Sequence, residues 1–452
     1  MPTDHREKGF EEAIEHVLTT TGGYRKGVPS AFDATLGLTP AEIVAFLKDT
    51  QPKAWERLEG FYGADVEAKV VQLVAKSLDQ RGTLDVLRHG ITDRGVSLRL
   101  AYFRPATTMN ADTLALYGKN ILTITRQVHY SVKEPEKSID VVLSLNGLPV
   151  ATVELKNPFT GQNVGHAKRQ YQNDRDPGEA LLRFKTRALV HFAVDPDLVY
   201  MTTRLAGGGT RFLPFNVGDA GGAGNPLNNA TGWRTAYLWE DVLTRDSWLD
   251  VLARFIHIEV REEERDGQTI RKESVIFPRY HQLTAVRKLI DAAQAEGAGH
   301  NYLIQHSAGS GKSNTIAWTA HRLASLHDAK NGKVFDTVIV VTDRRVLDKQ
   351  LQDTIYQFEH KQGVVKKIDT DTAQLVEAVR TGSGIIITTL QKFPFFMGQL
   401  RKQMEEEAKA SGKGPGSVKE AMGGARRYAI IVDEAHSSQS GESASQLRQG
   451  VF

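Results

Sequence analysis

The stretch Asn301–Thr315, NYLIQHSAGSGKSNT, decides the fold of the second half of the chain. A short apolar run comes first, small residues and Gly311-Lys312-Ser313 follow, and an apolar pattern with helical spacing comes last. This order predicts a strand, a glycine-rich loop and a helix. In such a loop the backbone N–H groups point at phosphate oxygens, and the start of the helix adds a favourable dipole. The stretch therefore predicts a site for the phosphates of a nucleotide.

Single residues of this loop have predicted roles. Gly309 and Gly311 lack a Cβ, so the backbone can approach the phosphates closely. Lys312 is predicted to reach the β- and γ-phosphates of ATP, and the Ser313 hydroxyl is predicted to hold Mg²⁺. His306 stands where the usual pattern has its first glycine, and a short G-K-S sequence also occurs in surface turns. The apolar run before the loop and the helix after it favour the nucleotide site.

Length and composition restrict the class of protein. The 452 residues suffice for two or three domains with separate cores, and 40% hydrophobic with 25% charged residues is ordinary for a globular protein. The net charge of +3 permits a nucleic-acid partner without requiring one. With no cysteine, the chain has no disulfide, thiolate nucleophile or Cys-ligated zinc. No secretion signal and no apolar run of about 18 residues is visible, so we expect a cytoplasmic protein.

A second stretch, Ser138–Asn157, predicts a β-hairpin, because two apolar strands flank Asn146-Gly147. Glu154 and Lys156 are two residues apart on the second strand and therefore point to one face of the sheet. Asp140 lies on the first strand and offers a second carboxylate.

Two carboxylates and a lysine on one face form a metal-dependent phosphodiesterase site. We predict that Asp140 and Glu154 hold Mg²⁺ together with the carbonyl of Leu155. Lys156 would orient the attacking water and stabilise charge on the phosphate. The alternative is a hairpin whose charged residues merely face solvent.

The register of the hairpin decides between these alternatives. A regular two-residue turn pairs Asp140 with Val153 and puts Asp140 and Glu154 on opposite faces. A three-residue loop, or a bulge in one strand, brings the two carboxylates to the same face, since one extra residue reverses the facing. We predict the longer loop or a bulge.

Two further segments of the first half carry polar patterns. Residues 165–177 predict a polar helix on which Gln170 and Tyr171 could contact the DNA backbone near the scissile bond, although an ordinary solvated helix fits equally well. The charged run 261–272 indicates a linker or a solvated turn.

The second half continues with buried-type strands. Residues 337–342, 384–389 and 428–432 are short apolar runs of the kind found in parallel sheets. Gln282, upstream of the phosphate loop, could read the adenine edge with a donor and an acceptor.

The last of these strands ends in Asp433-Glu434-Ala435-His436. Acidic residues at strand ends meet a phosphate loop at the carboxyl edge of a parallel sheet. We predict that Asp433 holds Mg²⁺ through water, that Glu434 polarises the attacking water, and that His436 couples hydrolysis to the DNA-binding side.

In their order, these motifs resemble the R subunit (HsdR) of type I restriction enzymes, a PD-(D/E)xK nuclease followed by a superfamily 2 helicase motor. The resemblance covers the whole chain and implies an α/β fold. It predicts an endonuclease domain with a mixed sheet flanked by helices over residues 1–259, a linker over 260–274, and a first RecA-like P-loop lobe with a parallel sheet over 275–452. The matching residues are Asp140, Glu154, Lys156, Gln282, Gly311, Lys312, Ser313 and Asp433 to His436.

The resemblance also implies roles for other residues. Glu12 would supply a further acidic group to the nuclease. The family pattern Q-x-x-x-Y is altered, because Gln170 and Tyr171 are adjacent here. The motifs that grip the DNA backbone would contribute Arg344, Arg345, Thr389, Gln391 and Lys392.

As a whole, the resemblance implies an enzyme that uses ATP and Mg²⁺ to pump double-stranded DNA and cuts it when translocation stalls. Its partners would be the methyltransferase (M) and specificity (S) subunits. The sequence ends at Phe452, before a second motor lobe, so we expect an N-terminal part of a larger subunit that binds ATP weakly and does not translocate. Two alternatives remain open: a DNA repair or remodelling helicase with a nuclease module, and a DNA-binding scaffold whose nuclease fold is inactive.

Overall fold

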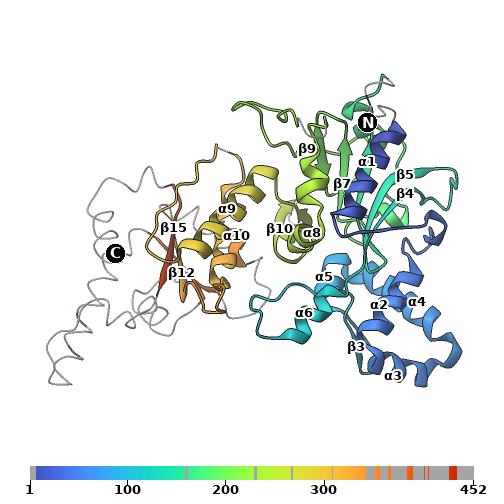
Figure 1. The fold of residues 1–452 in the computed structure, drawn as a ribbon, viewed down its shortest axis with the longest axis horizontal. Helices are drawn as coiled ribbons and strands as arrows, with labels where there is room; N and C mark the ends of the chain where they lie inside the picture. The colour runs from blue at the N-terminus through green and yellow to red at the C-terminus, as the bar shows by residue number, and fades with distance from the viewer. Residues whose placement is uncertain are drawn as a thin grey trace. The chain divides into compact units, whose positions relative to one another are not determined.

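The computed structural model of the chain divides into two compact units, which are described separately (Figure 1). Unit 1 comprises Met1–Pro105 and Asn110–Tyr280, and unit 2 comprises Ala106–Met109 and His281–Phe452. The structure describes residues 7–157, 161–228, 232–265, 268–307, 309–342, 351, 353–356, 365–367, 384–389, 402, 406 and 427–434.

Unit 1 is built on a mixed seven-stranded sheet with the order β1-β4-β5-β6-β7-β8-β9. The pairs β1–β4 and β6–β7 are parallel, and the other four pairs are antiparallel. The predicted mixed sheet is therefore confirmed. Its strands are β1 (Arg25–Lys26), β4 (Leu122–His129), β5 (Ser138–Leu145), β6 (Leu148–Leu155), β7 (Val190–Val194), β8 (Val199–Thr202) and β9 (Leu213–Pro214).

The β5–β6 hairpin contains both a tight turn and a bulge. Asn146 and Gly147 have φ values of 52° and 81°, as a two-residue turn matched to the strand twist requires. A Cβ on Gly147 would lie 2.6 Å from a backbone oxygen, so only glycine fits there. The register shifts next to Leu143 and Ser144, where Val150 is the additional residue of β6. The predicted bulge is confirmed, and the three-residue loop does not form.

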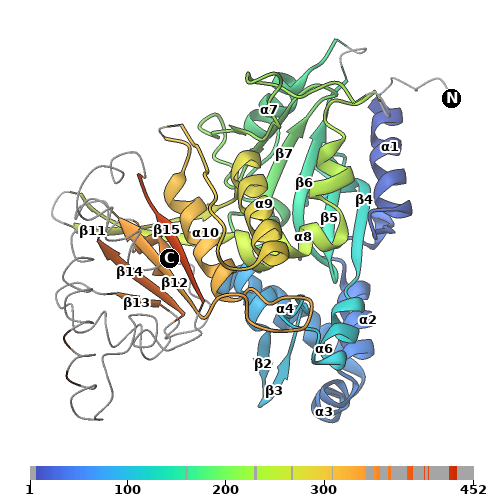
Figure 2. The same cartoon turned by 60° about the vertical axis from the view of Figure 1, so that its left-hand side comes forward.

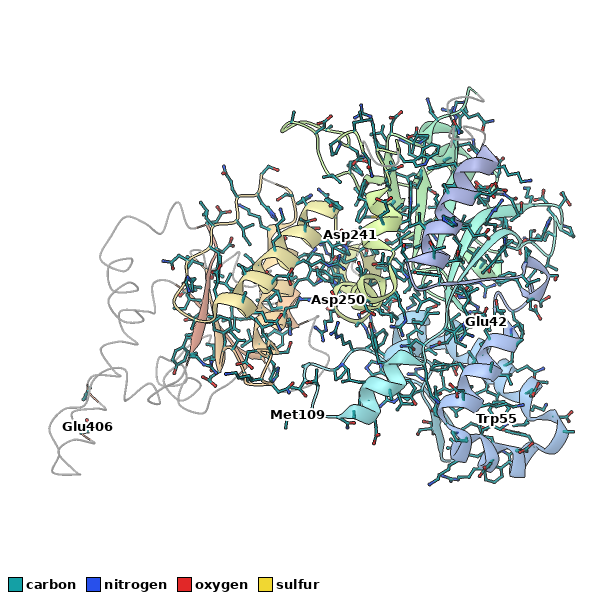
Figure 3. All side chains as sticks on the ribbon, in the orientation of Figure 1. Glu42, Trp55, Met109, Asp241, Asp250 and Glu406 are labelled. Carbon is teal, nitrogen blue, oxygen red and sulfur yellow. The ribbon has the colours of Figure 1, made fainter. Side chains whose placement is uncertain are left out.

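Helices flank this sheet, and the helices α2 to α5 pack against one another in a helical region of unit 1. The first helix is α1, whose Phe10 packs against Trp233 and Trp239 at 4.7 and 5.6 Å between ring centroids. In the helical region, Trp55 of α3 is buried (Figure 3). The helices are α1 (Glu7–Thr20), η1 (Pro29–Ala31), α2 (Pro40–Thr50), α3 (Pro52–Tyr62), η2 (Gly63–Asp65), α4 (Val66–Arg81), α5 (Thr83–His89), α6 (Ala111–Gly118), α7 (Val164–Asn173), η4 (Ala180–Leu182), η5 (Leu238–Val242), α8 (Arg245–Asp250) and η6 (Val251–Phe255).

One face of the sheet is covered by α7. Val164, Ala167 and Tyr171 of this helix lie in one buried cluster with Val142 of β5 and Ala193 of β7. Burial of such apolar side chains stabilises the layer by about 1.5–3 kcal/mol for each large residue. This packing fixes the position of α7 over the strands that carry the candidate site.

Two separate hairpins complete unit 1. In the first, β2 (Ile91–Asp93) pairs with β3 (Val96–Leu98). The described residues of 260–274, the predicted linker, lie in β10 (His257–Arg265) and β11 (Gln268–Ile276), which pair as an antiparallel hairpin.

Charged side chains interact across this hairpin. Lys272 on β11 forms an ion pair with Glu263 on β10 at 3.6 Å, diagonally across the two strands. The domain boundaries themselves stay a prediction.

Unit 2 has a parallel four-stranded sheet with the order β13-β14-β12-β15, against which α10 packs (Figure 2). The predicted parallel strands are confirmed for the described residues. The elements are α9 (Tyr280–Glu296), α10 (Lys312–Ala324), β12 (Thr337–Thr342), β13 (Val365–Lys367), β14 (Ile385–Thr389) and β15 (Tyr428–Val432).

The strand predicted at Tyr302–Ile304 is wrong. Residues 301–307 have no regular secondary structure, and Leu303 is 84% exposed. Three apolar residues are too short a run for periodicity to separate a strand from a coil. Among the described helices, none combines the length and apolar character needed to cross a membrane.

Candidate active sites in the two units

The bulge in β6 brings Asp140 and Glu154 together. Beyond it Val141 pairs with Val153, so the residues that continue each strand, Asp140 and Glu154, lie opposite each other. Asp140 Oδ2 accepts a hydrogen bond from the N–H of Leu155 at 2.7 Å. Both carboxylates are buried, with 7% of Asp140 and 0% of Glu154 exposed. The scaffold alternative required Asp140 to face away from Glu154, and this arrangement contradicts that requirement.

Glu154 has a charged partner that the sequence did not reveal. Arg175, two residues after α7, donates from Nε to Glu154 Oε1 at 2.6 Å and from a terminal nitrogen to the carbonyl of Ser138 at 2.7 Å. Burial raises the pKa of Glu154 well above its usual value, and the charge of Asp140 raises it further, against the opposing effect of Arg175. Burial alone would lower the pKa of Arg175, but Glu154 raises it above the usual value.

Lys156 lies at the carboxyl end of β6. Its backbone N–H donates to the carbonyl of Val194 on β7 at 2.9 Å, which continues the pairing of the two strands. The residue is 8% exposed. The open end of the β5–β6 hairpin, opposite its turn, therefore carries Asp140, Glu154 and Lys156. Their catalytic roles stay a prediction.

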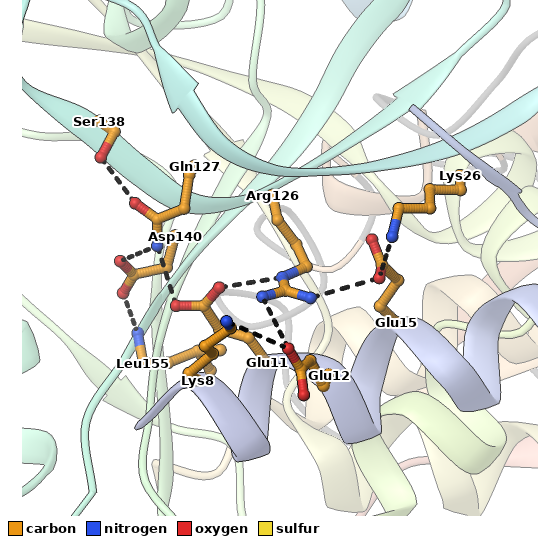
Figure 4. Close-up of polar contacts among 10 residues, drawn as sticks. All are labelled: Lys8, Glu11, Glu12, Glu15, Lys26, Arg126, Gln127, Ser138, Asp140 and Leu155. Atoms are coloured by element: carbon orange, nitrogen blue, oxygen red, sulfur yellow. Dashed lines mark hydrogen bonds and ion pairs between the residues drawn. The ribbon is translucent and has the colours of Figure 1, made fainter. Parts of the chain in front are cut away.

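The helix α1 brings Glu11, the neighbour of the predicted Glu12, toward Asp140 (Figure 4). Glu11 is 5% exposed and accepts hydrogen bonds from Arg126 Nε at 3.0 Å and from Gln127 Nε2 at 2.9 Å. Gln127 Nε2 also reaches Asp140 Oδ1 at 3.4 Å. The side chain of Glu12 is 51% exposed, and its carboxylate is 3.8 Å from Arg126. The contacts thus favour Glu11 over Glu12 as the acid of α1 next to Asp140, and the role predicted for Glu12 stays a prediction.

Glu11 is tied to the site electrostatically as well as by contact. Burial raises its pKa, Arg126 opposes this effect, and the negative charge of Asp140 raises the pKa further. The sequence contained a signal for Glu11, because Glu11 and Glu15 are spaced one helical turn apart and so lie on one face of α1. In the structure both contact Arg126.

The prediction that Tyr171 contacts DNA is wrong. The side chain is fully buried, and its hydroxyl lies 2.7 Å from Thr152 Oγ1, which lies 2.8 Å from His191 Nδ1. Burial raises the pKa of Tyr171 and lowers that of His191 to about 3, so both groups stay neutral inside the core. Gln170, its neighbour, is only partly buried, and its role stays a prediction.

The carboxylates fit a magnesium ion by their chemistry. Glu154 Oε2 is buried and has no hydrogen-bond partner among the described residues, and an orphaned carboxylate oxygen is costly unless a ligand meets it. Within the described part of the chain, no three or more His, Asp or Glu side chains are grouped to hold a metal. Mg²⁺ usually uses only one or two carboxylates and keeps several waters, so Asp140 and Glu154 suffice.

In unit 2 the phosphate loop is held by the residue predicted to read adenine. Gln282 is 3% exposed and donates from Nε2 to the carbonyl of Gly311 at 2.9 Å. Gly311 has φ 88° and caps α10, and a Cβ there would lie 2.5 Å from Gln282 Nε2. Gly309 also has a positive φ, 73°. Both glycines adopt a backbone conformation that other residues rarely adopt. Their close approach to phosphates and the recognition of adenine by Gln282 stay predictions.

The loop and the last described strand meet in space. Lys312 Nζ lies 2.5 Å from Glu434 Oε1, and the backbone N–H of Asp433 donates to the carbonyl of Val341 at 2.9 Å. Burial raises the pKa of Asp433. Ser313 lies in the first turn of α10, next to Lys312. The acidic strand end and the phosphate loop therefore share one edge of the sheet.

Several predicted DNA contacts lie outside the described residues. Thr389 ends β14 and is 4% exposed, and its role in DNA binding stays a prediction. The residues outside the described part of the chain are Arg344, Arg345, Gln391, Lys392 and His436.

Family comparisons classify both units. Residues 281–451, which lie in unit 2, match the family described as SWI2/SNF2 ATPase. Residues 95–210 match the family described as the N terminus of the type I restriction enzyme R protein. These two matches confirm the resemblance of the motifs to the N-terminal region of a type I restriction enzyme R protein.

Curated relatives agree with these matches. The chain is 26% identical over 347 residues to the type I restriction enzyme HindI endonuclease subunit of Haemophilus influenzae, which covers 74% of this chain and 29% of that protein. It is 26% identical over 340 residues to the SsaAORF53P endonuclease subunit of Staphylococcus saprophyticus, covering 73% and 30%. The putative MjaIXP endonuclease subunit of Methanocaldococcus jannaschii is 22% identical over 334 residues. The chain spans less than a third of the length of these relatives.

Proposed function

We propose that this chain is the N-terminal part of the R subunit of a type I restriction-modification enzyme. In this proposal, unit 1 is an Mg²⁺-dependent endonuclease of the PD-(D/E)xK type, and unit 2 is the first RecA-like lobe of an ATP-driven translocase. The substrate is double-stranded DNA, the partners are the M and S subunits, and the location is cytoplasmic. The family matches and the names of the relatives support the assignment.

The observation that carries the nuclease assignment is the bulge at Val150. A strand bulge disrupts regular pairing and is typically found where a side chain must be re-aimed. Here the bulge places Glu154, which lies two residues before Lys156, opposite Asp140. Two buried carboxylates beside each other repel, which is costly in a structure that has no use for them.

Each residue of the nuclease site has a task in this proposal. Asp140 and Glu154 hold Mg²⁺ with the carbonyl of Leu155, and the bound ion stabilises charge that develops on the phosphate. Lys156 orients the attacking water and adds positive charge beside the phosphate. Glu11 steadies Asp140 through Gln127, which contacts both carboxylates.

The ATP site follows the same reasoning. Lys312, which pairs with Glu434 in this structure, would bind the β- and γ-phosphates when ATP enters. Glu434 would orient the attacking water. Ser313 and Asp433 would hold the Mg²⁺ of the nucleotide, with Asp433 acting through water.

Lys156→Ala tests the nuclease assignment in the complete R subunit reconstituted with M and S. We expect cleavage of unmethylated plasmid in Mg²⁺ and ATP to fall by at least about a hundredfold, as for loss of a group that stabilises the transition state, with ATPase activity retained. Lys133→Ala is the matched control, because Lys133 is an exposed lysine paired with Asp176 on the surface. Cleavage that survives Lys156→Ala would refute the assignment.

The same assay separates the proposal from a repair helicase with a nuclease module. Cleavage that requires ATP together with M and S supports the type I enzyme. Cleavage that proceeds without the partner subunits would favour the free-standing helicase–nuclease.

A further inference from the structure

Arg175 connects the two strands that carry the candidate nuclease carboxylates. Its guanidinium group donates to Glu154 Oε1 on β6 and to the carbonyl of Ser138 on β5. Its central carbon also lies 5.5 Å from the centre of the Tyr130 ring. The side chain of Arg175 is 4% exposed and that of Glu154 is 0% exposed, so this is a buried ion pair anchored at two points.

The pairing is one-sided on the carboxylate. Arginine commonly grips a carboxylate with two parallel hydrogen bonds, one to each oxygen. Here only Oε1 is held, while Oε2 is buried without a hydrogen-bond partner among the described residues. A pair that served burial alone would gain from satisfying both oxygens, because an unsatisfied buried acceptor costs about 1–3 kcal/mol.

The second anchor explains why Arg175 stays in this orientation. Ser138 is two residues before Asp140 on β5, so the hydrogen bond to its carbonyl ties the guanidinium group to the strand that carries the other carboxylate. Rotation toward Oε2 would break this bond. The orientation of Glu154 is therefore set from both strands at once.

We propose that Arg175 is a positioning residue that holds Glu154 by one oxygen and thereby presents Oε2, beside Asp140, to the metal ion. The inference rests on the proposed nuclease function and names the residue that organises its metal site. Groups that hydrogen-bond to metal-binding carboxylates typically change metal affinity by about 10–100-fold when they are removed.

Binding of Mn²⁺ alone, without DNA or ATP, provides the test. Titration of the complete R subunit by calorimetry, with metal-bound Mn²⁺ followed by electron paramagnetic resonance, measures the site without relying on cleavage. We expect Arg175→Met to weaken Mn²⁺ binding by about 10–100-fold. Lys133→Met is the matched control, because it removes an exposed ion pair to Asp176, the residue that follows Arg175. We expect this control to bind Mn²⁺ with unchanged affinity.

A conservative variant keeps the test decisive if Arg175→Met fails to fold. Lysine carries the same charge but only one compact ammonium group, so it cannot hold Glu154 and the Ser138 carbonyl in the same planar geometry. We expect Arg175→Lys to fold and to bind Mn²⁺ with an affinity between those of the wild type and Arg175→Met. Wild-type affinity in Arg175→Lys would overturn the positioning role.

Two further variants separate this inference from the proposed function. If Asp140→Asn leaves Mn²⁺ binding unchanged, the metal site itself is wrong and both proposals fail. If Asp140→Asn abolishes binding but a folded Arg175→Met binds like the wild type, only the inference fails, and Arg175 is a structural ion pair. In a Glu154→Gln background we expect Arg175→Met to cause little additional loss, because its effect passes through Glu154.

Discussion

Glu11 and Glu12 are neighbours on α1 with different surroundings, so they form a matched pair for testing. Glu11 is bound by Arg126 and by Gln127, which also contacts Asp140, whereas Glu12 is half exposed. Glu11→Gln removes a buried negative charge next to Asp140, and we expect Mn²⁺ affinity and DNA cleavage to fall about tenfold. Glu12→Gln should leave both unchanged. The reverse order of effects would restore Glu12 as the acidic group of the nuclease.

The bulge in β6 is the element on which the nuclease site depends. Deleting Val150 would restore regular pairing and turn every later residue of β6, including Glu154, to the opposite face. We expect loss of Asp140-dependent Mn²⁺ binding and a decrease in the free energy of unfolding of about 2–5 kcal/mol, since buried side chains would exchange faces. Calorimetric metal titration and urea unfolding measure the two effects. Deleting Gly222 from the exposed loop between β9 and η5 controls for shortening, and metal binding that survives the Val150 deletion would show that the bulge is dispensable.

Among the elements of the nuclease site, features set by neighbouring residues were predictable from the sequence, whereas contacts between residues distant in the chain were not. Asn146-Gly147 specifies its turn through the φ values of two adjacent residues, so sequence alone predicted the hairpin. The bulge was predicted only because the chemistry required Asp140 and Glu154 on one face. Arg175 lies 21 residues from Glu154 along the chain, and nothing local marks their contact. The strand predicted at Tyr302–Ile304 was wrong because the apolar residues were assumed to be buried, whereas they are exposed.

At the scale of the molecule, the two candidate sites belong to separate compact units. Lys312→Ala removes a charge-assisted contact to the phosphates of ATP, worth about 1.5–3 kcal/mol, so we expect ATP affinity to fall at least about tenfold. In the complete enzyme with M and S, plasmid cleavage should be lost with it. Asp140-dependent Mn²⁺ binding should persist, because the nuclease carboxylates are positioned by contacts within unit 1. Lys330→Ala, an exposed lysine in unit 2, is the control, and loss of Mn²⁺ binding in Lys312→Ala would instead show that the phosphate loop governs the assembly of the nuclease site.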